Sequence, residues 1–167
     1  LLDYDSDALS YASELGELVS KAVGRLVDFS LVAGSIHNLP HGSNAYRGSD
    51  WTNTFDFVFN EGVPQHWGYN PHDWRRQHSI NEMVRVTKPG GFVCVIANNA
   101  DCPEIMEMAN RVDHTYKGMP TREKPFTMVE LRERLEKAGL KDIHTEPVPD
   151  DPYFKVARLI VGWGVKR

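Results

Sequence analysis

The chain has 167 residues, 41% of them hydrophobic, which suits a single domain with a hydrophobic core. Its net charge is −4 and no block of Lys or Arg occurs, so it lacks the electrostatic footprint of a protein that binds nucleic acid or anionic membranes. No apolar stretch approaches the roughly 20 residues of a membrane helix. The only cysteines, Cys94 and Cys102, fit a reducing compartment, so we expect a cytoplasmic protein with inert thiols.

The first residues, Leu1 to Asp3, have the character of the end of a strand, and the chain does not begin with methionine. We therefore expect a piece of a longer protein. A helix is predicted over about Asp7 to Val23, because apolar residues recur there at helical spacing and Ser6 can cap the first turn. Val27 to Ala33 then predicts a strand that closes at the turn-prone Gly34-Ser35.

A polar loop from His41 to Thr54 precedes an almost unbroken apolar run, FDFVF, at residues 55–59. A short apolar run of this kind predicts a strand buried on both faces, as in parallel sheets covered by helices. The run ends abruptly in Asn60-Glu61 and turns on Gly62. In such sheets ligands bind beyond the carboxyl ends of the strands, so Asn60 and Glu61 stand where a ligand is expected.

A helix of about four turns is predicted next, because Asn70-Pro71-His72-Asp73 supplies a cap, a first-turn proline and an early carboxylate. Lys88-Pro89-Gly90-Gly91 ends this helix, since proline cannot continue it and the glycines allow a sharp reversal. Phe92 to Ala97 predicts a second strand buried on both faces. A further helix is expected from Asp101 to about His114.

The clearest local signal is the segment PFTMVELRERLEKAGL, in which Thr127 and Glu130 predict a capping box and Gly139 a left-handed helix exit. Two strands, Asp142 to Val148 and Phe154 to Val165, follow closely enough to form a hairpin. The alternation of strands and helices predicts a doubly wound α/β fold. Its sheet should be mostly parallel, with right-handed crossovers and one antiparallel strand at the carboxyl-terminal end.

The succession of DYDSDAL, GSIHNLP, FDFVFNEGVPQHW, EMVRVTKPGGFVCVI and FTMVELRERLEKAGL, followed by a hairpin, resembles the class I S-adenosylmethionine-dependent methyltransferases, and among them the type 11-like domain. The similarity covers essentially the whole chain, and the KPGG turn is its most telling part. The resemblance implies a Rossmann-like sheet with helices on both faces and the cofactor across the strand ends. On that mapping residues 1–167 are one domain that lacks its first strand, its glycine-rich turn and the helix after them, because Leu1 to Asp3 matches the end of the second strand.

The resemblance places S-adenosyl-L-methionine against residues at three strand ends. Asp3 matches the family's acidic residue that accepts hydrogen bonds from both ribose hydroxyls, which suits a carboxylate with two acceptor oxygens. Ser35 stands where relatives often carry an Asp against the adenine amino group, so the charge-assisted part of that bond is lost. Structural alternatives stay open: Asp3 could cap a helix, and Ser35 could belong to a simple turn. The implied cofactor-binding residues are Asp3, Tyr4, Ser35, Ile36, Asn60, Glu61 and Gly62.

Methyl transfer from a sulfonium is an in-line displacement with an already activated leaving group, so proximity and alignment can supply most of the rate. A base is needed only if the acceptor must lose a proton. His66 titrates in the right range for that role, although a loop histidine can also be merely solvated. Val63, His66 and Trp67 are predicted to contact the methyl acceptor, a small molecule or a protein. Tyr69 and Trp74 are further candidates for the lining of the acceptor pocket, although core packing is the expected role of Trp74.

The acceptor pocket is expected to be shaped by the polar loop at residues 41–54 and by residues 113–124. None of the histidines shows a spacing that predicts a metal site.

Two other functions stay open. A non-catalytic module of the same fold would use the sheet to bind a partner, which the serine at position 35 favours. A nicotinamide-dependent oxidoreductase is the second, but no Gly-x-Gly-x-x-Gly follows a strand and the closing hairpin is unlike that fold.

Overall fold

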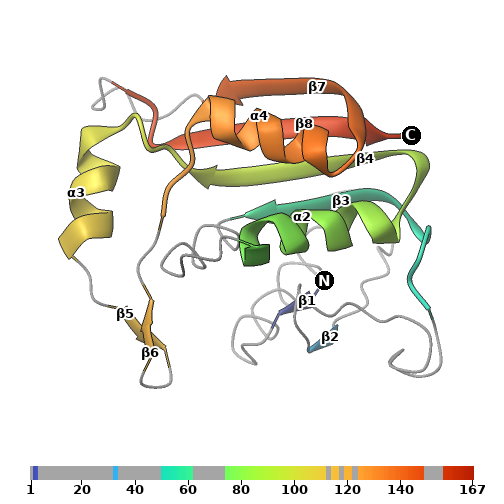
Figure 1. Ribbon diagram of the computed structural model, residues 1–167, viewed down its shortest axis with the longest axis horizontal. Helices are drawn as coiled ribbons and strands as arrows, with labels where there is room; N and C mark the ends of the chain where they lie inside the picture. Colours follow the sequence, from blue (N-terminus) through green and yellow to red (C-terminus); the bar gives the residue numbers. More distant parts are fainter. Residues whose placement is uncertain are drawn as a thin grey trace, which may run out of the picture.

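The computed structural model describes residues 2–3, 32–33, 50–61, 74–111, 114–116, 119–121, 124–148 and 156–167. The predicted helix at residues 7–23 and most of the predicted loop at residues 41–54 lie outside these ranges. The strands and helices follow the chain in this order (Figure 1): β1 (Leu2–Asp3), β2 (Val32–Ala33), β3 (Phe55–Glu61), α2 (Trp74–Val86), β4 (Thr87–Asn98), α3 (Pro103–Arg111), β5 (His114–Tyr116), β6 (Met119–Thr121), α4 (Met128–Lys137), β7 (Leu140–Pro147) and β8 (Leu159–Lys166).

A four-stranded mixed sheet in the order β3-β4-β8-β7 forms the centre of the described structure (Figure 1). β3 and β4 are parallel and are joined through α2, whereas β8 is antiparallel to both β4 and β7. β1 and β2 form a separate parallel pair, and β5 and β6 a small antiparallel hairpin. The parallel pairs, the helical crossover and the closing antiparallel strand confirm the predicted α/β, Rossmann-like class.

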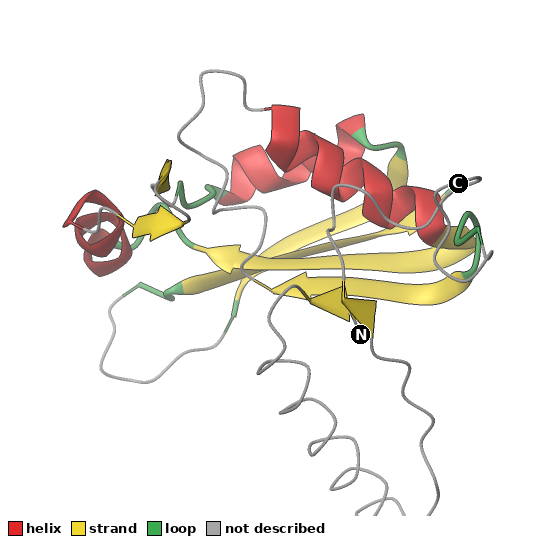
Figure 2. Ribbon diagram, turned by 90° about the horizontal axis from the view of Figure 1, so that it is seen from below, coloured by secondary structure: helices red, strands yellow, loops and turns green. Residues whose placement is uncertain are grey.

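The two longest described helices, α2 and α4, cover one face of this sheet (Figure 2). α2 packs on β3 and β4, whereas α4 packs on β7 and β8. α4 packs so closely on β8 that a Cβ atom at Gly162 would lie 2.8 Å from the Cδ2 atom of Leu131. None of the described helices is long and apolar enough to cross a membrane. The core between helices and sheet contains Ile80, Met83, Val84, Val93, Val95, Ala97, Phe126, Leu131, Leu135, Leu140 and Ile160.

The prediction that β3 and β4 are buried on both faces is wrong for the described structure. Side chains alternate along a strand, so Val58 packs against the core while its neighbours Phe57 and Phe59 point to the other face. Phe57 and Phe59 are 58% and 55% exposed, and Phe92, which pairs with Phe57 from β4, is 49% exposed. The reason is that α2 and α4 cover the same face, and none of the described helices covers the opposite one.

The segment between β4 and α4 also differs from the prediction. The helix expected to run to His114 ends at Arg111, and His114 begins the β5–β6 hairpin, which was not predicted. The second apolar strand is longer than expected, because β4 runs from Thr87 to Asn98 and includes the Lys88-Pro89-Gly90-Gly91 turn. This turn bulges out of the pairing with β3: Phe55 lies opposite Thr87, but Phe57 lies opposite Phe92.

The predicted boundaries of α4 are confirmed. The Thr127 hydroxyl oxygen accepts a hydrogen bond from the Glu130 backbone N–H at 3.0 Å, and Gly139 has the left-handed φ of 89°. The capping box is only half formed, however. The Glu130 carboxylate accepts hydrogen bonds from Arg76 and Arg134 instead of returning to the cap, which ties α4 to α2.

Gly91 is expected to tolerate no side chain. A Cβ atom there would lie 2.8 Å from the Asp56 carbonyl oxygen, a backbone atom that cannot move aside easily. We expect Gly91→Ala to lower the free energy of unfolding by about 1–3 kcal/mol, measured by urea denaturation. Gly90 has a φ of 80° and open space around it, so Gly90→Asn should cost little because asparagine tolerates this conformation. Equal losses for Gly91→Asn and Gly90→Asn would contradict the steric explanation.

Candidate functional site

Three of the four strands in parallel pairs, β1, β3 and β4, end in polar residues. β1 ends at Asp3, which lies opposite Ala33, the last residue of β2. β3 ends at Glu61 opposite Ile96, and β4 continues to Asn98. Parallel neighbours run in the same direction, so the carboxyl ends within each pair lie at one edge. Open α/β sheets bind ligands at that edge.

Three of the predicted cofactor residues belong to the described structure: Asp3, Asn60 and Glu61. Asp3 is the last residue of β1 and pairs with Ala33, which precedes Ser35 by two positions in the sequence. The role of Asp3 at the ribose stays a prediction. The other predicted site residues lie outside the described ranges, so their roles stay predictions. They are Tyr4, Ser35, Ile36, Gly62, Val63, His66 and Trp67.

Asn60 and Glu61 end β3 with side chains on opposite faces of the sheet. Asn60 is half-buried and shares the helix-covered face with Val58, whereas Glu61 is exposed on the face of Phe57 and Phe59. The Glu61 carboxylate makes no hydrogen bond or ion pair with other described residues. It is therefore available to accept hydrogen bonds from a ligand at this edge.

Asn99, immediately after β4, was not among the predicted site residues. Its backbone N–H donates to the Arg158 carbonyl oxygen and its Nδ2 atom to the Ala157 carbonyl oxygen, both at 2.8 Å, while its Oδ1 atom accepts from the Asp101 N–H at 2.9 Å. Asn99 also forms an isolated β-bridge with Phe126. It thus fixes the polypeptide at the carboxyl end of β4. The signal for it was present, because Asn98-Asn99 follows an apolar run just as Asn60-Glu61 does.

Arg76, in the first turns of α2, is fully buried and was also missed. Its Nη1 atom donates to Glu130 Oε1 at 2.8 Å, its Nη2 atom donates to the Lys124 carbonyl oxygen at 3.1 Å, and its guanidinium lies 3.5 Å from the centre of the Phe126 ring. Burial lowers the pKa of the Arg76 guanidinium to about 10, although Glu130 favours the charged form. Arg76 therefore stays charged at neutral pH. No local sequence pattern predicted its burial.

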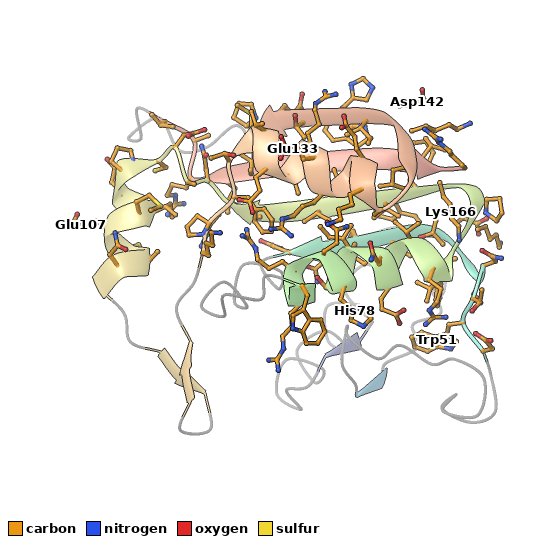
Figure 3. The ribbon with its side chains drawn as sticks, in the orientation of Figure 1. Trp51, His78, Glu107, Glu133, Asp142 and Lys166 are labelled. Carbon is orange, nitrogen blue, oxygen red and sulfur yellow. The ribbon has the colours of Figure 1, made fainter. Side chains whose placement is uncertain are left out.

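Trp74, the first residue of α2, does not pack in the core as expected but is 53% exposed. The Arg75 guanidinium lies 5.4 Å from the centre of its ring, and the His78 ring lies 5.9 Å away one turn further along α2. Figure 3 shows His78 on the side of α2 that faces away from α4. Because α2 begins at the same edge of the sheet at which β3 ends, Trp74 offers an aromatic surface beside the strand ends.

The two thiols have no feature of a nucleophile. Cys94 is half-buried in β4, and burial raises the pKa of its thiol, which lowers the thiolate fraction at neutral pH. Cys102 is fully buried, with its Sγ atom 3.2 Å from Glu104 Oε2. Within the described ranges, no three His, Cys, Asp or Glu side chains come together as a metal site.

The described residues fit a nucleoside cofactor at the strand ends. Asp3 and Glu61, at the ends of two strands that are each part of a parallel pair, carry carboxylates that accept hydrogen bonds and donate none at neutral pH. A ribose diol supplies two donors and needs such acceptors. The chemistry of these residues is therefore compatible with S-adenosylmethionine.

The fold is that of Rossmann-like methyltransferases. Residues 1–95 match the family model described as "Methyltransferase domain", which covers more than half of the chain. The chain belongs to this family of methyltransferase domains. No protein of curated function matches it in sequence.

Solved structures of the same fold are distant in sequence. An S-adenosylmethionine-dependent methyltransferase from Thermotoga maritima, described as a possible histamine N-methyltransferase, is 18% identical with a TM-score of 0.59 over 90% of this chain and 70% of its own. A possible exported protein from Bordetella parapertussis is 18% identical with a TM-score of 0.64 over 99% of this chain and 52% of its own. An O-methyltransferase family protein from Burkholderia thailandensis is 11% identical with a TM-score of 0.63 over 99% of this chain and 42% of its own. The chain thus spans about half the length of the last two.

Proposed function

We propose that the protein containing this chain transfers a methyl group from S-adenosyl-L-methionine to a small-molecule or protein acceptor in the cytoplasm. The observation that carries the proposal is the position of Asp3: in a chain of the methyltransferase domain family, it ends a strand that is paired in parallel with β2. A carboxylate at such a strand end suits the two hydroxyls of a ribose. Glu61, exposed at the end of β3, adds a second acceptor.

The roles of the site residues are those that the resemblance to the methyltransferase family implies. Asp3 accepts hydrogen bonds from the ribose hydroxyls, and Tyr4, Ser35 and Ile36 surround the adenine. Asn60, Glu61 and Gly62 border the cofactor at the end of β3, and Val63, His66 and Trp67 contact the acceptor. Bound S-adenosylmethionine supplies a methyl group on a positively charged sulfur.

In the displacement, the acceptor's lone pair forms a bond to the methyl carbon while the carbon–sulfur bond breaks and its electron pair stays on sulfur, which leaves S-adenosylhomocysteine. The protein's part is to align the acceptor with that bond. If the acceptor carries a proton, His66 takes it up.

Titration of the full-length protein with S-adenosylhomocysteine in a calorimeter tests the proposal. We expect saturable binding, and we expect Asp3→Ala to weaken it by about 1–3 kcal/mol, because buried hydroxyl donors of the ligand lose their acceptor. Asp56→Ala is the matched control. Asp56 is an exposed carboxylate near the opposite end of β3, so its loss should leave the affinity unchanged.

The two possible failures have different meanings. Absence of saturable heat from the unmodified full-length protein would contradict methyl transfer and favour a non-catalytic module of the same fold. Saturable binding that Asp3→Ala leaves unchanged would keep the cofactor but remove Asp3 from its site.

A further inference from the structure

Three connections meet the carboxyl edge of the four-stranded sheet. Residues 62–73 join β3 to α2, and residues 99–127, which include α3 and the β5–β6 hairpin, join β4 to α4. Residues 148–158 join β7 to β8 at the same edge, because β8 is antiparallel to β4 and so begins where β4 ends. Under the proposed function, the ligand binds at this edge.

Two of these connections are tied together at the end of β4. The Phe126 N–H donates to the Asn98 carbonyl oxygen at 2.9 Å, and the Ala100 N–H donates to the Phe126 carbonyl oxygen at 2.8 Å. On the other side of the same stretch, Asn99 holds Ala157 and Arg158 through its side chain and backbone. Phe126, near the end of the connection 99–127, and Ala157 and Arg158, at the end of the connection 148–158, are therefore all anchored on residues 98–100.

Arg76 adds the third connection to this junction. It lies two residues after the start of α2, and its guanidinium stacks on the Phe126 ring while donating to the Lys124 carbonyl oxygen. Glu130 at the start of α4 accepts a further hydrogen bond from Arg76 and also from Arg134. One fully buried side chain thus fixes the starts of α2 and α4 relative to residues 124–126.

The choice of arginine is informative. A buried ion pair adds little net stability compared with well-packed apolar residues. The guanidinium of arginine, however, is planar and has several donors in fixed directions, so its hydrogen bonds impose one geometry. Lysine could pair with Glu130 but could not at the same time cover the Phe126 ring and reach the Lys124 carbonyl oxygen. The contacts of Arg76 therefore serve position more than stability.

We propose that Arg76 is a positioning residue that fixes the start of α2, the start of α4 and residues 124–126 against residues 98–100, at the edge where the proposed function places the ligand. Its importance for the ligand edge rests on the proposed methyltransferase function. Its direct structural consequence is that the pairing between residues 98–100 and Phe126 depends on Arg76.

Hydrogen exchange of the full-length protein, followed by NMR, tests the proposal. The reporters are the amides of Ala100 and Phe126, whose hydrogen bonds form the junction, and the amides of Val93 and Val95 in the centre of β4. We expect Arg76→Lys and Arg76→Met each to speed exchange at Ala100 and Phe126 by at least about tenfold through local opening. Exchange at Val93 and Val95 should stay within about twofold of the unmodified protein in both variants.

Arg132→Met is the matched control, because Arg132 is a half-exposed arginine of α4 whose nearest acid, Glu136, lies 3.9 Å away. It should leave all four amides unchanged. Unchanged exchange at Ala100 and Phe126 in Arg76→Lys would overturn the proposal, since charge alone would then suffice. An equal increase at all four amides would also overturn it, because Arg76 would then be a general stability residue.

Titration of the same variants with S-adenosylhomocysteine separates this inference from the proposed function. We expect the unmodified protein and Arg76→Lys to bind S-adenosylhomocysteine with similar affinity. The reason is that the predicted cofactor residues lie at the ends of β1, β2 and β3 and not at the junction. Failure of the unmodified protein to bind would contradict the methyltransferase proposal, whereas the exchange rates at Ala100 and Phe126 decide the positioning role of Arg76 independently.

Discussion

Replacement of Phe126 by alanine is expected to lower the free energy of unfolding by about 3–5 kcal/mol. Phe126 is fully buried in the core between α2, α4 and the end of β4, and its ring supports the buried guanidinium of Arg76 at 3.5 Å. Truncation leaves a cavity and removes the apolar cover of a buried charge. Urea denaturation monitored by circular dichroism measures the loss.

The matched control is Phe59→Ala, which removes the same atoms from an exposed position. Phe59 is more than half exposed on the face of the sheet opposite α2 and α4. Its removal should change the free energy of unfolding by less than about 1 kcal/mol. A loss at Phe59 as large as that at Phe126 would mean that the exposed face is covered in the full-length protein.

Leu135→Ala is expected to lower the free energy of unfolding by about 2–5 kcal/mol. Leu135 is fully buried between α4 and the sheet, and its Cδ1 atom lies 2.9 Å from the position of a Cβ atom at Gly162. The backbone of β8 is already as close as glycine permits. The cavity can therefore close only partly, so the loss should lie well above that of a surface truncation.

Val129→Ala provides the comparison on the same helix. Val129 is 66% exposed on α4, so its truncation removes little buried surface and should stay within about 0.5 kcal/mol of the unmodified protein. Similar losses for Leu135→Ala and Val129→Ala would show that α4 does not pack on the sheet as the structure describes.

The local features of the fold could be predicted from the sequence because their causes are local. Thr127 caps α4 through the N–H of a residue three positions on, and Gly139 and Gly90 adopt positive φ angles that glycine alone adopts freely. The hairpin of β7 and β8 follows from two β-prone segments that are close in sequence. Each of these signals lies within a few residues of the structure that it specifies.

The candidate site could be predicted only in part. The ends of strands are local signals, so Asp3 and Glu61 were placed correctly at the carboxyl ends of β1 and β3. The junction of Asn99, Phe126 and Arg76 was missed, because its contacts join residues that are distant in the chain, such as Arg76 and Glu130, 54 positions apart, and Asn99 and Ala157, 58 positions apart. An arginine in a helix start gives no sign of the ring and carbonyl oxygen that it will meet.

The amino-acid sequence by itself determined the alternation of helices and strands as an α/β chain, the cap and exit of α4, and the acidic residues that close β1 and β3. Only the tertiary structure decided which side chains are buried. Phe57 and Phe59 belong to one of the most apolar segments, yet they are exposed, whereas the charged Arg76 is fully buried. Burial depends on which distant segments cover a surface, and hydrophobic residues cannot specify by themselves that such a cover is present.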